Sequence, residues 1–144
     1  MAVAHILKQK GAAVHTVAPG DSVQSIVEAL AKHRIGAVVV TDSKGSIAGI
    51  VSERDVVRAM AGKGGAVLSN TAADIMTAKV RTCGPNDTEA DLMALMTEHR
   101  IRHLPVVSNG KLAGMISIGD VVKLRMEMME RETDDLKTYI ASAG

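Results

Sequence analysis

The chain has 144 residues, with 17 Lys and Arg against 16 Asp and Glu, and 47% of its residues are hydrophobic. A formal net charge of +1, with Tyr139 as the only aromatic residue, excludes a basic nucleic-acid-binding surface with rings for base stacking. The longest apolar stretches fall far short of the roughly 18 residues of a membrane span, and the first residues lack a signal-peptide pattern. Cys83 has no second cysteine for a disulfide, which indicates a reducing compartment. We therefore expect a cytoplasmic protein that binds neither membranes nor nucleic acid.

Residues 14–58 and 80–123 carry nearly the same sequence. The pattern Gly-x-x-Ser-x-x-Asp, for example, occurs at 49–55 and again at 114–120. A unit of about 45 residues is too small to be comfortably stable alone, so the two copies are expected to pack on each other. Two similar copies predict a pseudo-symmetric body with equivalent surfaces.

Each copy is expected to follow the order strand, helix, strand, strand, helix. In the first unit, 1–68, which includes a helical N-terminal segment, Asp21 and Ser22 are N-cap candidates. The apolar stripe of that helix is Val23, Ile26, Val27 and Leu30. In the second unit, 69–144, Thr88 begins the equivalent helix. Its expected buried positions are Leu92, Met93 and Met96.

Short β-branched runs follow these two helices. The runs at 37–40 and 104–107 predict the first strands of hairpins that turn at Gly45 and Gly110. Between the units, the Gly-Lys-Gly-Gly stretch at 62–65 is expected to be a flexible connector. It lacks the Ser or Thr and the following helix that a phosphate-binding loop needs.

An extended helix is predicted at the C-terminus, because Asp120 to Ile140 contain neither Gly nor Pro. Its seam residues alternate at spacings of four and three: Val122, Met126, Met129, Thr133, Leu136 and Ile140. Glu127 and Arg131 can pair at i, i+4 outside the seam. Either a second copy covers the seam, which predicts a homodimer, or the N-terminal segment 3–7 covers it within one chain.

The segments GIVSERD (49–55) and GMISIGD (114–120), with HRIRHLPVV (99–107) and ADIMT (73–77), resemble the cystathionine β-synthase (CBS) domain family. A tandem pair of such domains is a Bateman module. The resemblance implies an α+β fold in which two pseudo-symmetric β-α-β-β-α repeats pack sheet to sheet and form two clefts. It also implies binding of adenosine-containing ligands such as AMP, ADP, ATP, NAD or S-adenosylmethionine, in a regulatory role.

The two Ser/Asp pairs offer suitable chemistry for such ligands. A carboxylate can accept from both ribose hydroxyls, and a hydroxyl at a helix start suits phosphate. The alternative is that each Asp only caps its helix. By position, the resemblance assigns to a first cleft Lys10, His15, Ile35, Gly36, Arg102, His103, Ser117 and Asp120. It assigns to a second cleft Ser52, Arg54, Asp55, Thr77, Val80, Arg81, Ile101 and Arg102, with walls at 76–81 and 101–102.

The sequence contains no pattern typical of catalysis. Its His residues and Cys83 lack metal-ligand spacing, and no nucleophile is paired with a base. We therefore expect a non-catalytic sensor, without metal or catalytic cofactor, that binds AMP, ADP, ATP or NAD and signals through an effector protein or its own assembly. The alternatives are a ligand-free structural or protein-interaction module and a nucleotide hydrolase.

Overall fold

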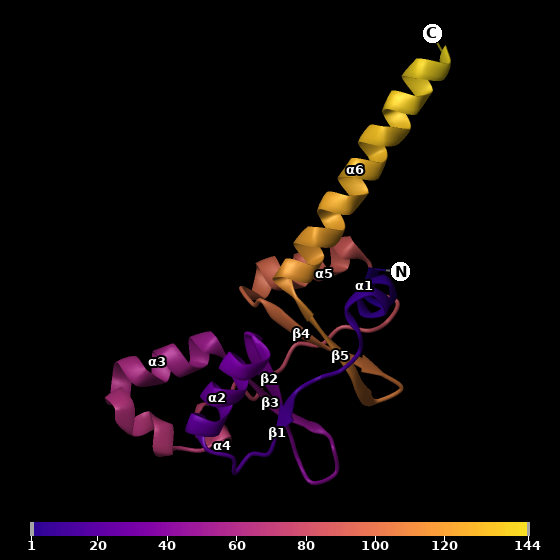
Figure 1. Ribbon diagram of the computed structural model, residues 1–144. Coiled ribbons are helices and arrows are strands. Elements are labelled where there is room, and N and C mark those ends of the chain that lie inside the picture. Colours follow the sequence, from indigo (N-terminus) through magenta and orange to yellow (C-terminus); the bar gives the residue numbers. More distant parts are fainter. Residues whose placement is uncertain (1, 144) are drawn as a thin grey trace.

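The computed structural model describes residues 2–143, and its helices and strands follow the order seen in Figure 1. They are α1 (Ala2–Lys10), β1 (Thr16–Val17), α2 (Val23–His33), β2 (Ala37–Thr41), β3 (Ile47–Ser52), α3 (Glu53–Lys63), η1 (Gly64–Ser69), α4 (Ala72–Ile75), α5 (Glu89–His99), β4 (His103–Ser108), β5 (Lys111–Ser117) and α6 (Ile118–Ala143). The predicted α+β class is confirmed, and the first unit has the predicted element order.

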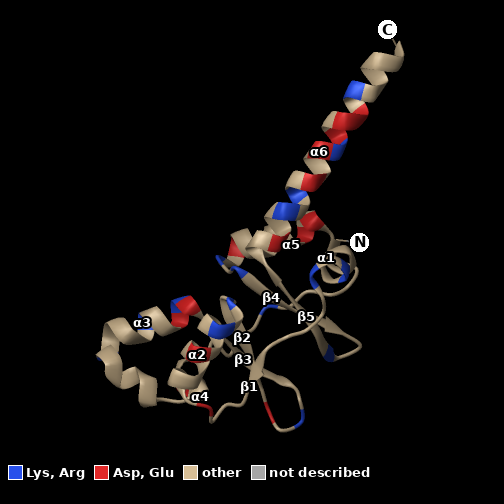
Figure 2. Ribbon diagram, viewed as in Figure 1, with Lys and Arg blue, Asp and Glu red and all other residues tan. Residues whose placement is uncertain are grey.

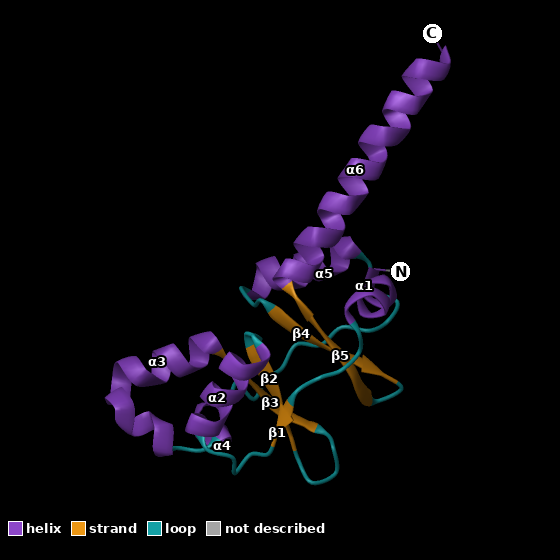
Figure 3. Ribbon diagram, viewed as in Figure 1, coloured by secondary structure: helices purple, strands orange, loops and turns teal. Residues whose placement is uncertain are grey.

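The strands form two small sheets, one in each unit (Figure 3). In the first sheet, of order β1-β2-β3, β2 and β3 are antiparallel with Val39 opposite Ile50, and β1 is parallel to β2. In the second, β4 and β5 are antiparallel. Gly45 and Gly110 have φ of 80° and 75° at the two hairpin turns, in the left-handed region that glycine enters freely. The predicted hairpins are therefore confirmed.

The leading strand of the second unit is reduced to one isolated parallel bridge between Cys83 and Val106. In the first unit, the Val39 N–H donates to the His15 carbonyl at 3.2 Å and so lengthens the pairing with β1. Pro105 stands at the position equivalent to Val39, and proline has no N–H to donate. The second ladder is therefore one bond shorter, which explains the missing strand.

Side-chain caps define where the longer helices begin. Ser22 and Thr88 are the N-caps of α2 and α5, as predicted, and Ser52 is the N-cap of α3. Asp55 is the third residue of α3, where its carboxylate accepts from the Ser52 N–H in a capping box. Asp91 has the same role on α5.

The two units interlock through the segments that precede them. α1 crosses to the second unit, where Val3 and Ile6 are buried in one core cluster with Val121 and Leu124. In the opposite direction, Thr77 pairs with Ile50 at the edge of the first sheet, through hydrogen bonds of 3.0 and 2.9 Å. Each unit is thus completed by the segment that leads into the other.

Two equivalent glycines permit this interlocking. A Cβ at Gly49 would lie 2.5 Å from the Met76 sulfur and 2.9 Å from the Thr77 carbonyl oxygen, while a Cβ at Gly114 would meet only the Leu7 side chain, at 2.6 Å. A leucine side chain can move aside, whereas a backbone carbonyl in a ladder cannot do so cheaply.

We therefore expect Gly49→Ala to lower the free energy of unfolding by about 1–3 kcal/mol, as is usual for overpacking, and Gly114→Ala to lower it less. Urea denaturation of both variants and of the wild type measures this. Equal midpoints for Gly49→Ala and the wild type would contradict the described contact.

The connector differs from the prediction. α3 continues through Lys63, and the following residues form the 3-10 helix η1, in which Val67 is fully buried. This buried valine anchors the connector against the first unit, so residues 62–65 are part of an ordered helical segment and not a flexible loop.

α6 leaves the body and projects away from it (Figure 1). Val121 and Leu124, near its start, are buried against α1 and the second sheet. The predicted seam lies on another face and is exposed: Val122 (44%), Met126 (57%), Met129 (54%), Leu136 (59%) and Ile140 (61%). α1 therefore does not cover the seam. The carboxylate of Glu127 lies 3.8 Å from His5 instead of pairing with Arg131.

No helix within residues 2–143 is long and apolar enough to cross a bilayer.

Candidate functional site

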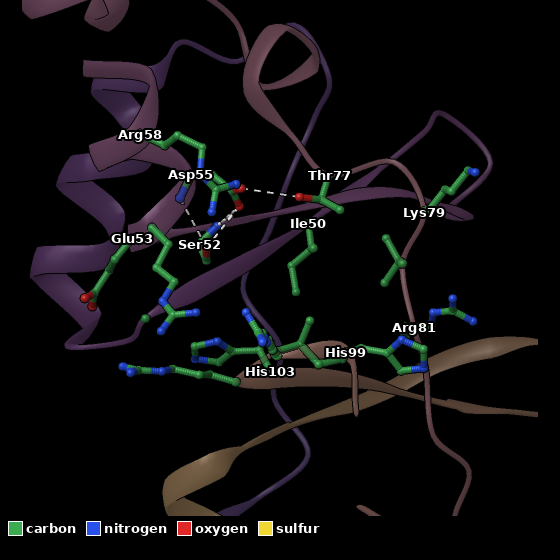
Figure 4. A pocket seen from close by; sticks show the side chains of 16 residues that line it. Ile50, Ser52, Glu53, Asp55, Arg58, Thr77, Lys79, Arg81, His99 and His103 are labelled. Atoms are coloured by element: carbon green, nitrogen blue, oxygen red, sulfur yellow. Dashed lines mark hydrogen bonds between the residues drawn. The ribbon is translucent and has the colours of Figure 1, made fainter. Parts of the chain in front are cut away.

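A cleft of about 520 Å³ opens between the two units, a volume in the usual range for small-molecule sites (Figure 4). We call it the Asp55 cleft. It is lined by Gly36, Ile50, Ser52, Glu53, Arg54, Asp55, Arg58, Thr77, Lys79, Val80, Arg81, His99, Arg100, Ile101, Arg102 and His103. Both units therefore contribute to its walls.

Asp55 is held in a defined orientation at this cleft. Its Oδ2 accepts from the Ser52 N–H at 2.8 Å and from the Ser52 hydroxyl at 3.0 Å, and its Oδ1 accepts from the Thr77 hydroxyl at 3.3 Å (Figure 4). A carboxylate offers about four acceptor sites, so these three bonds leave capacity for a further donor. Helix capping and contact with a ligand diol are thus compatible roles for Asp55.

Cationic side chains outnumber carboxylates in the Asp55 cleft. The six cations are Arg54, Arg58, Lys79, Arg81, Arg100 and Arg102, against the carboxylates of Glu53 and Asp55. Among the ion pairs that the structure shows within residues 2–143, none involves any of these six. Figure 4 shows Arg58 beside Asp55, with Lys79 and Arg81 on the opposite side of the cleft. The cleft therefore carries positive charge that no protein group neutralises by direct contact.

Gly36 and His103 meet at the inner wall of this cleft. A Cβ at Gly36 would lie 3.0 Å from the His103 ring, and the Gly36 carbonyl accepts from the Glu53 N–H at 2.9 Å. Burial lowers the pKa of His103, although the nearby Glu53 carboxylate acts to raise it. The imidazole is therefore neutral near pH 7, and it provides a wall without adding charge.

Asp120, the equivalent of Asp55, has a different environment. The Lys10 ammonium donates to its Oδ2 at 2.8 Å and to the Met115 carbonyl at 3.0 Å. Partial burial acts to raise the pKa of Asp120, but hydrogen bonds from Lys10 and from the Ser117 N–H lower it below its ordinary value. The depression beside Lys10 measures only about 70 Å³, well below nucleotide size. The Asp120 carboxylate is thus occupied by a protein cation.

The structure brings together ten of the fifteen predicted site residues in the Asp55 cleft. They are Gly36, Ser52, Arg54, Asp55, Thr77, Val80, Arg81, Ile101, Arg102 and His103. Gly36 and His103 had been assigned to the other cleft, with Asp120, and His103 does stay beside that cluster, since it pairs with Ser117 across β4 and β5. They line the Asp55 cleft because Gly36 precedes β2, His103 begins β4, and these two segments touch between the units.

The other five predicted residues lie outside this cleft. Lys10, Ser117 and Asp120 form the separate cluster described above. Ile35 packs against the core of the first unit. The His15 ring stacks on His33, with centroids 3.9 Å apart.

Of the other six lining residues, Lys79 lies in the predicted wall at 76–81, and sequence reasoning missed five: Ile50, Glu53, Arg58, His99 and Arg100. One of them had a usable signal. Arg58 follows Asp55 by three residues on a predicted helix, and residues at i and i+3 share a face. His99 and Arg100 end α5, and their position at the cleft depends on how the two units pack.

The remaining candidate groups do not suggest reaction chemistry. Cys83 is only 4% exposed, and burial raises the pKa of its thiol to about 12, so it stays protonated. Among residues 2–143, no three His, Cys, Asp or Glu side chains converge as metal ligands would.

The fold and this two-unit cleft agree with a known family. The model of the CBS domain matches residues 10–62 and 72–127, so the chain belongs to the CBS domain family and contains two copies. The crystal structure of the CBS-domain containing protein ATU1752 from Agrobacterium tumefaciens is 50% identical, with a TM-score of 0.83 over 85% of this chain and 92% of that one.

Two further relatives extend the comparison. The CBS domain protein PAE2072 from Pyrobaculum aerophilum, solved in complex with AMP, is 29% identical, with a TM-score of 0.76 over 91% of this chain and 98% of that one. The mitochondrial CBS domain-containing protein CBSX3 of Arabidopsis thaliana is 37% identical over 124 residues, which make up 83% of this chain but 60% of that protein.

Proposed function

We propose that this protein is a regulatory module that binds an adenine nucleotide in the Asp55 cleft without transforming it. One observation carries the proposal: the Asp55 carboxylate retains acceptor capacity inside a cleft of about 520 Å³ whose walls are rich in cations. A ribose diol and an anionic phosphate are the groups that this combination suits. The AMP complex of PAE2072 supports an adenosine ligand.

A nucleotide can bind at Asp120 only by breaking a contact that the protein already makes there. A ligand diol must displace the Lys10 ammonium, whose bond to the carboxylate measures 2.8 Å. The two sites therefore differ in affinity, and the Asp55 cleft fills first. The protein acts in the cytoplasm and passes the signal to an effector protein or to its own assembly.

Ligand-induced thermal stabilisation tests the proposal against a structural module with empty clefts. A ligand that binds only the folded state adds about 2.7 kcal/mol at a hundredfold excess over Kd. We expect the unfolding midpoint to rise progressively with AMP concentration, and a midpoint that stays constant would favour the structural module.

Incubation with ATP or NAD should return both molecules intact. Product formation that is lost on mutating a cleft residue would favour a hydrolase.

We further propose that the protein is a homodimer held by α6. The seam residues of its projecting part are 44–61% exposed, and covering them removes apolar surface from water. A second copy offers the same seam, which suits a two-stranded coiled coil.

Charges of both signs are distributed along α6 (Figure 2), and their positions in the heptad favour a parallel arrangement. In parallel helices, Arg125 faces Glu130 of the second copy, and Glu132 faces its Lys137. In the antiparallel arrangement that aligns the same seam, Lys123 would instead face Lys137, and Glu130 and Glu132 would each face their own equivalents. Arg125 also contacts Glu89 within one chain, at 3.5 Å, and remains 56% exposed for a second partner.

A further inference from the structure

We infer that the Asp55 cleft selects adenosine ligands that carry two or more linked phosphates, such as ADP, ATP or a dinucleotide, over AMP. The inference rests on the proposed function, because it assumes that the adenosine group binds in this cleft. It is carried by the number and distribution of the six cleft cations, which nucleotide binding as such does not require.

The amount of charge in the Asp55 cleft exceeds what one phosphate neutralises. Six cations against two carboxylates leave a clear positive excess, and no protein carboxylate contacts any of the six within the described residues. A phosphate monoester carries about 1.5 to 2 negative charges near pH 7. One such group leaves part of the excess uncompensated, whereas a chain of phosphates can neutralise more of it.

The cations of the Asp55 cleft lie on two sides of it. Arg54 and Arg58 lie one turn apart on α3 and flank Asp55 in sequence, while Lys79 and Arg81 line the opposite side (Figure 4). A ligand anchored through its ribose at Asp55 must extend across the cleft to meet both groups. Linked phosphates extend the ligand from one group toward the other, whereas AMP carries a single phosphate at one end of this path.

The type of cation in the Asp55 cleft also suits phosphate. Five of the six are arginines, whose planar guanidinium forms paired hydrogen bonds to phosphate oxygens. The same field disfavours S-adenosylmethionine, because its sulfonium and ammonium groups are cationic. The Asp120 cluster offers no comparable surface, since Lys10 already neutralises its carboxylate.

Calorimetric titration of the whole protein with AMP, ADP, ATP, NAD and S-adenosylmethionine tests the inference. We expect at least one of ADP, ATP and NAD to bind at least about tenfold more tightly than AMP, and S-adenosylmethionine to bind more weakly than AMP. Tighter binding of ADP or ATP would indicate a preference for a longer phosphate chain, and tighter binding of NAD would indicate a preference for a dinucleotide. Raising NaCl from about 50 to about 300 mM should reduce the preference, because these side chains are exposed to screening ions.

Variants on the two sides of the cleft test whether the positions of the cations determine the preference. Arg58→Gln and Arg81→Gln should each weaken the preferred ligand about tenfold, while AMP loses affinity with at most one of them. Arg131→Gln, an exposed arginine on the projecting part of α6, is the matched control and should change neither ligand. AMP binding as tight as that of every longer ligand would overturn the inference and leave the proposed function intact. Absence of binding by all five ligands would reject both.

Discussion

Asp55→Asn is expected to weaken binding of AMP to the Asp55 cleft at least about tenfold while the protein stays folded. The carboxylate is the cleft acceptor that faces a ribose diol in our proposal, and hydrogen bonds to a charged group contribute roughly 1.5–3 kcal/mol each. Asparagine keeps one acceptor oxygen for the capping bond from the Ser52 N–H, which measures 2.8 Å in the wild type. The cost to folding should therefore stay within the usual range for a cap, about 0.5–2 kcal/mol.

Asp91→Asn is the matched control for this variant. Asp91 is also the third residue of its helix and accepts from the Thr88 N–H at 2.9 Å, but it is exposed and outside the cleft. Both variants should lose similar stability in urea, and only Asp55→Asn should lose AMP affinity by calorimetry. Equal AMP affinity in the wild type and Asp55→Asn would show that the ligand site is misplaced. Asp120→Asn should have the corresponding effect on the weaker second site.

Removal of the C-terminal half of α6 is expected to convert the homodimer to a monomer. A chain that ends at Glu130 keeps Leu124, which is buried in its own protomer, but loses Leu136 and Ile140 from the seam. The dimer dissociation constant should rise by at least about a hundredfold, since burial of a large apolar side chain contributes about 1.5–3 kcal/mol. Light scattering over a concentration series measures the change, and an unaltered mass would reject the α6 dimer.

A charge exchange tests the parallel arrangement separately. Lys137→Glu places a carboxylate opposite Glu132 of the second copy, at both equivalent contacts of the dimer. The repulsion should weaken the dimer about tenfold. Adding Glu132→Lys restores opposite charges in parallel helices and should recover the wild-type affinity. Failure of the double variant to recover would contradict the parallel arrangement, even if the truncation dissociates the dimer.

Features that depend on local chemistry could be predicted from the sequence. Ser22 and Thr88 cap their helices as expected, since a side-chain oxygen needs only the next turn of backbone to bond. The hairpins at Gly45 and Gly110 follow in the same way from turn chemistry. The pairing of Ser52 with Asp55 is another such local arrangement.

Features that depend on how the units pack could not be predicted. The position of His103 in the Asp55 cleft follows from its contact with Gly36, 67 residues earlier in the chain. The Lys10 bond to Asp120 spans 110 positions and requires α1 to cross to the other unit. The two copies already differ in sequence at this site, since Gly119 stands at the position equivalent to Arg54, and the Lys10 side chain from outside the repeat makes the two sites still more unequal.

Calorimetric titration of the wild-type protein with AMP, ADP, ATP and NAD tests the central claim most directly. We expect saturable heat for at least one of these ligands, with binding that Asp55→Asn weakens. If none of the four produces measurable heat at millimolar concentration, the nucleotide-binding function is contradicted.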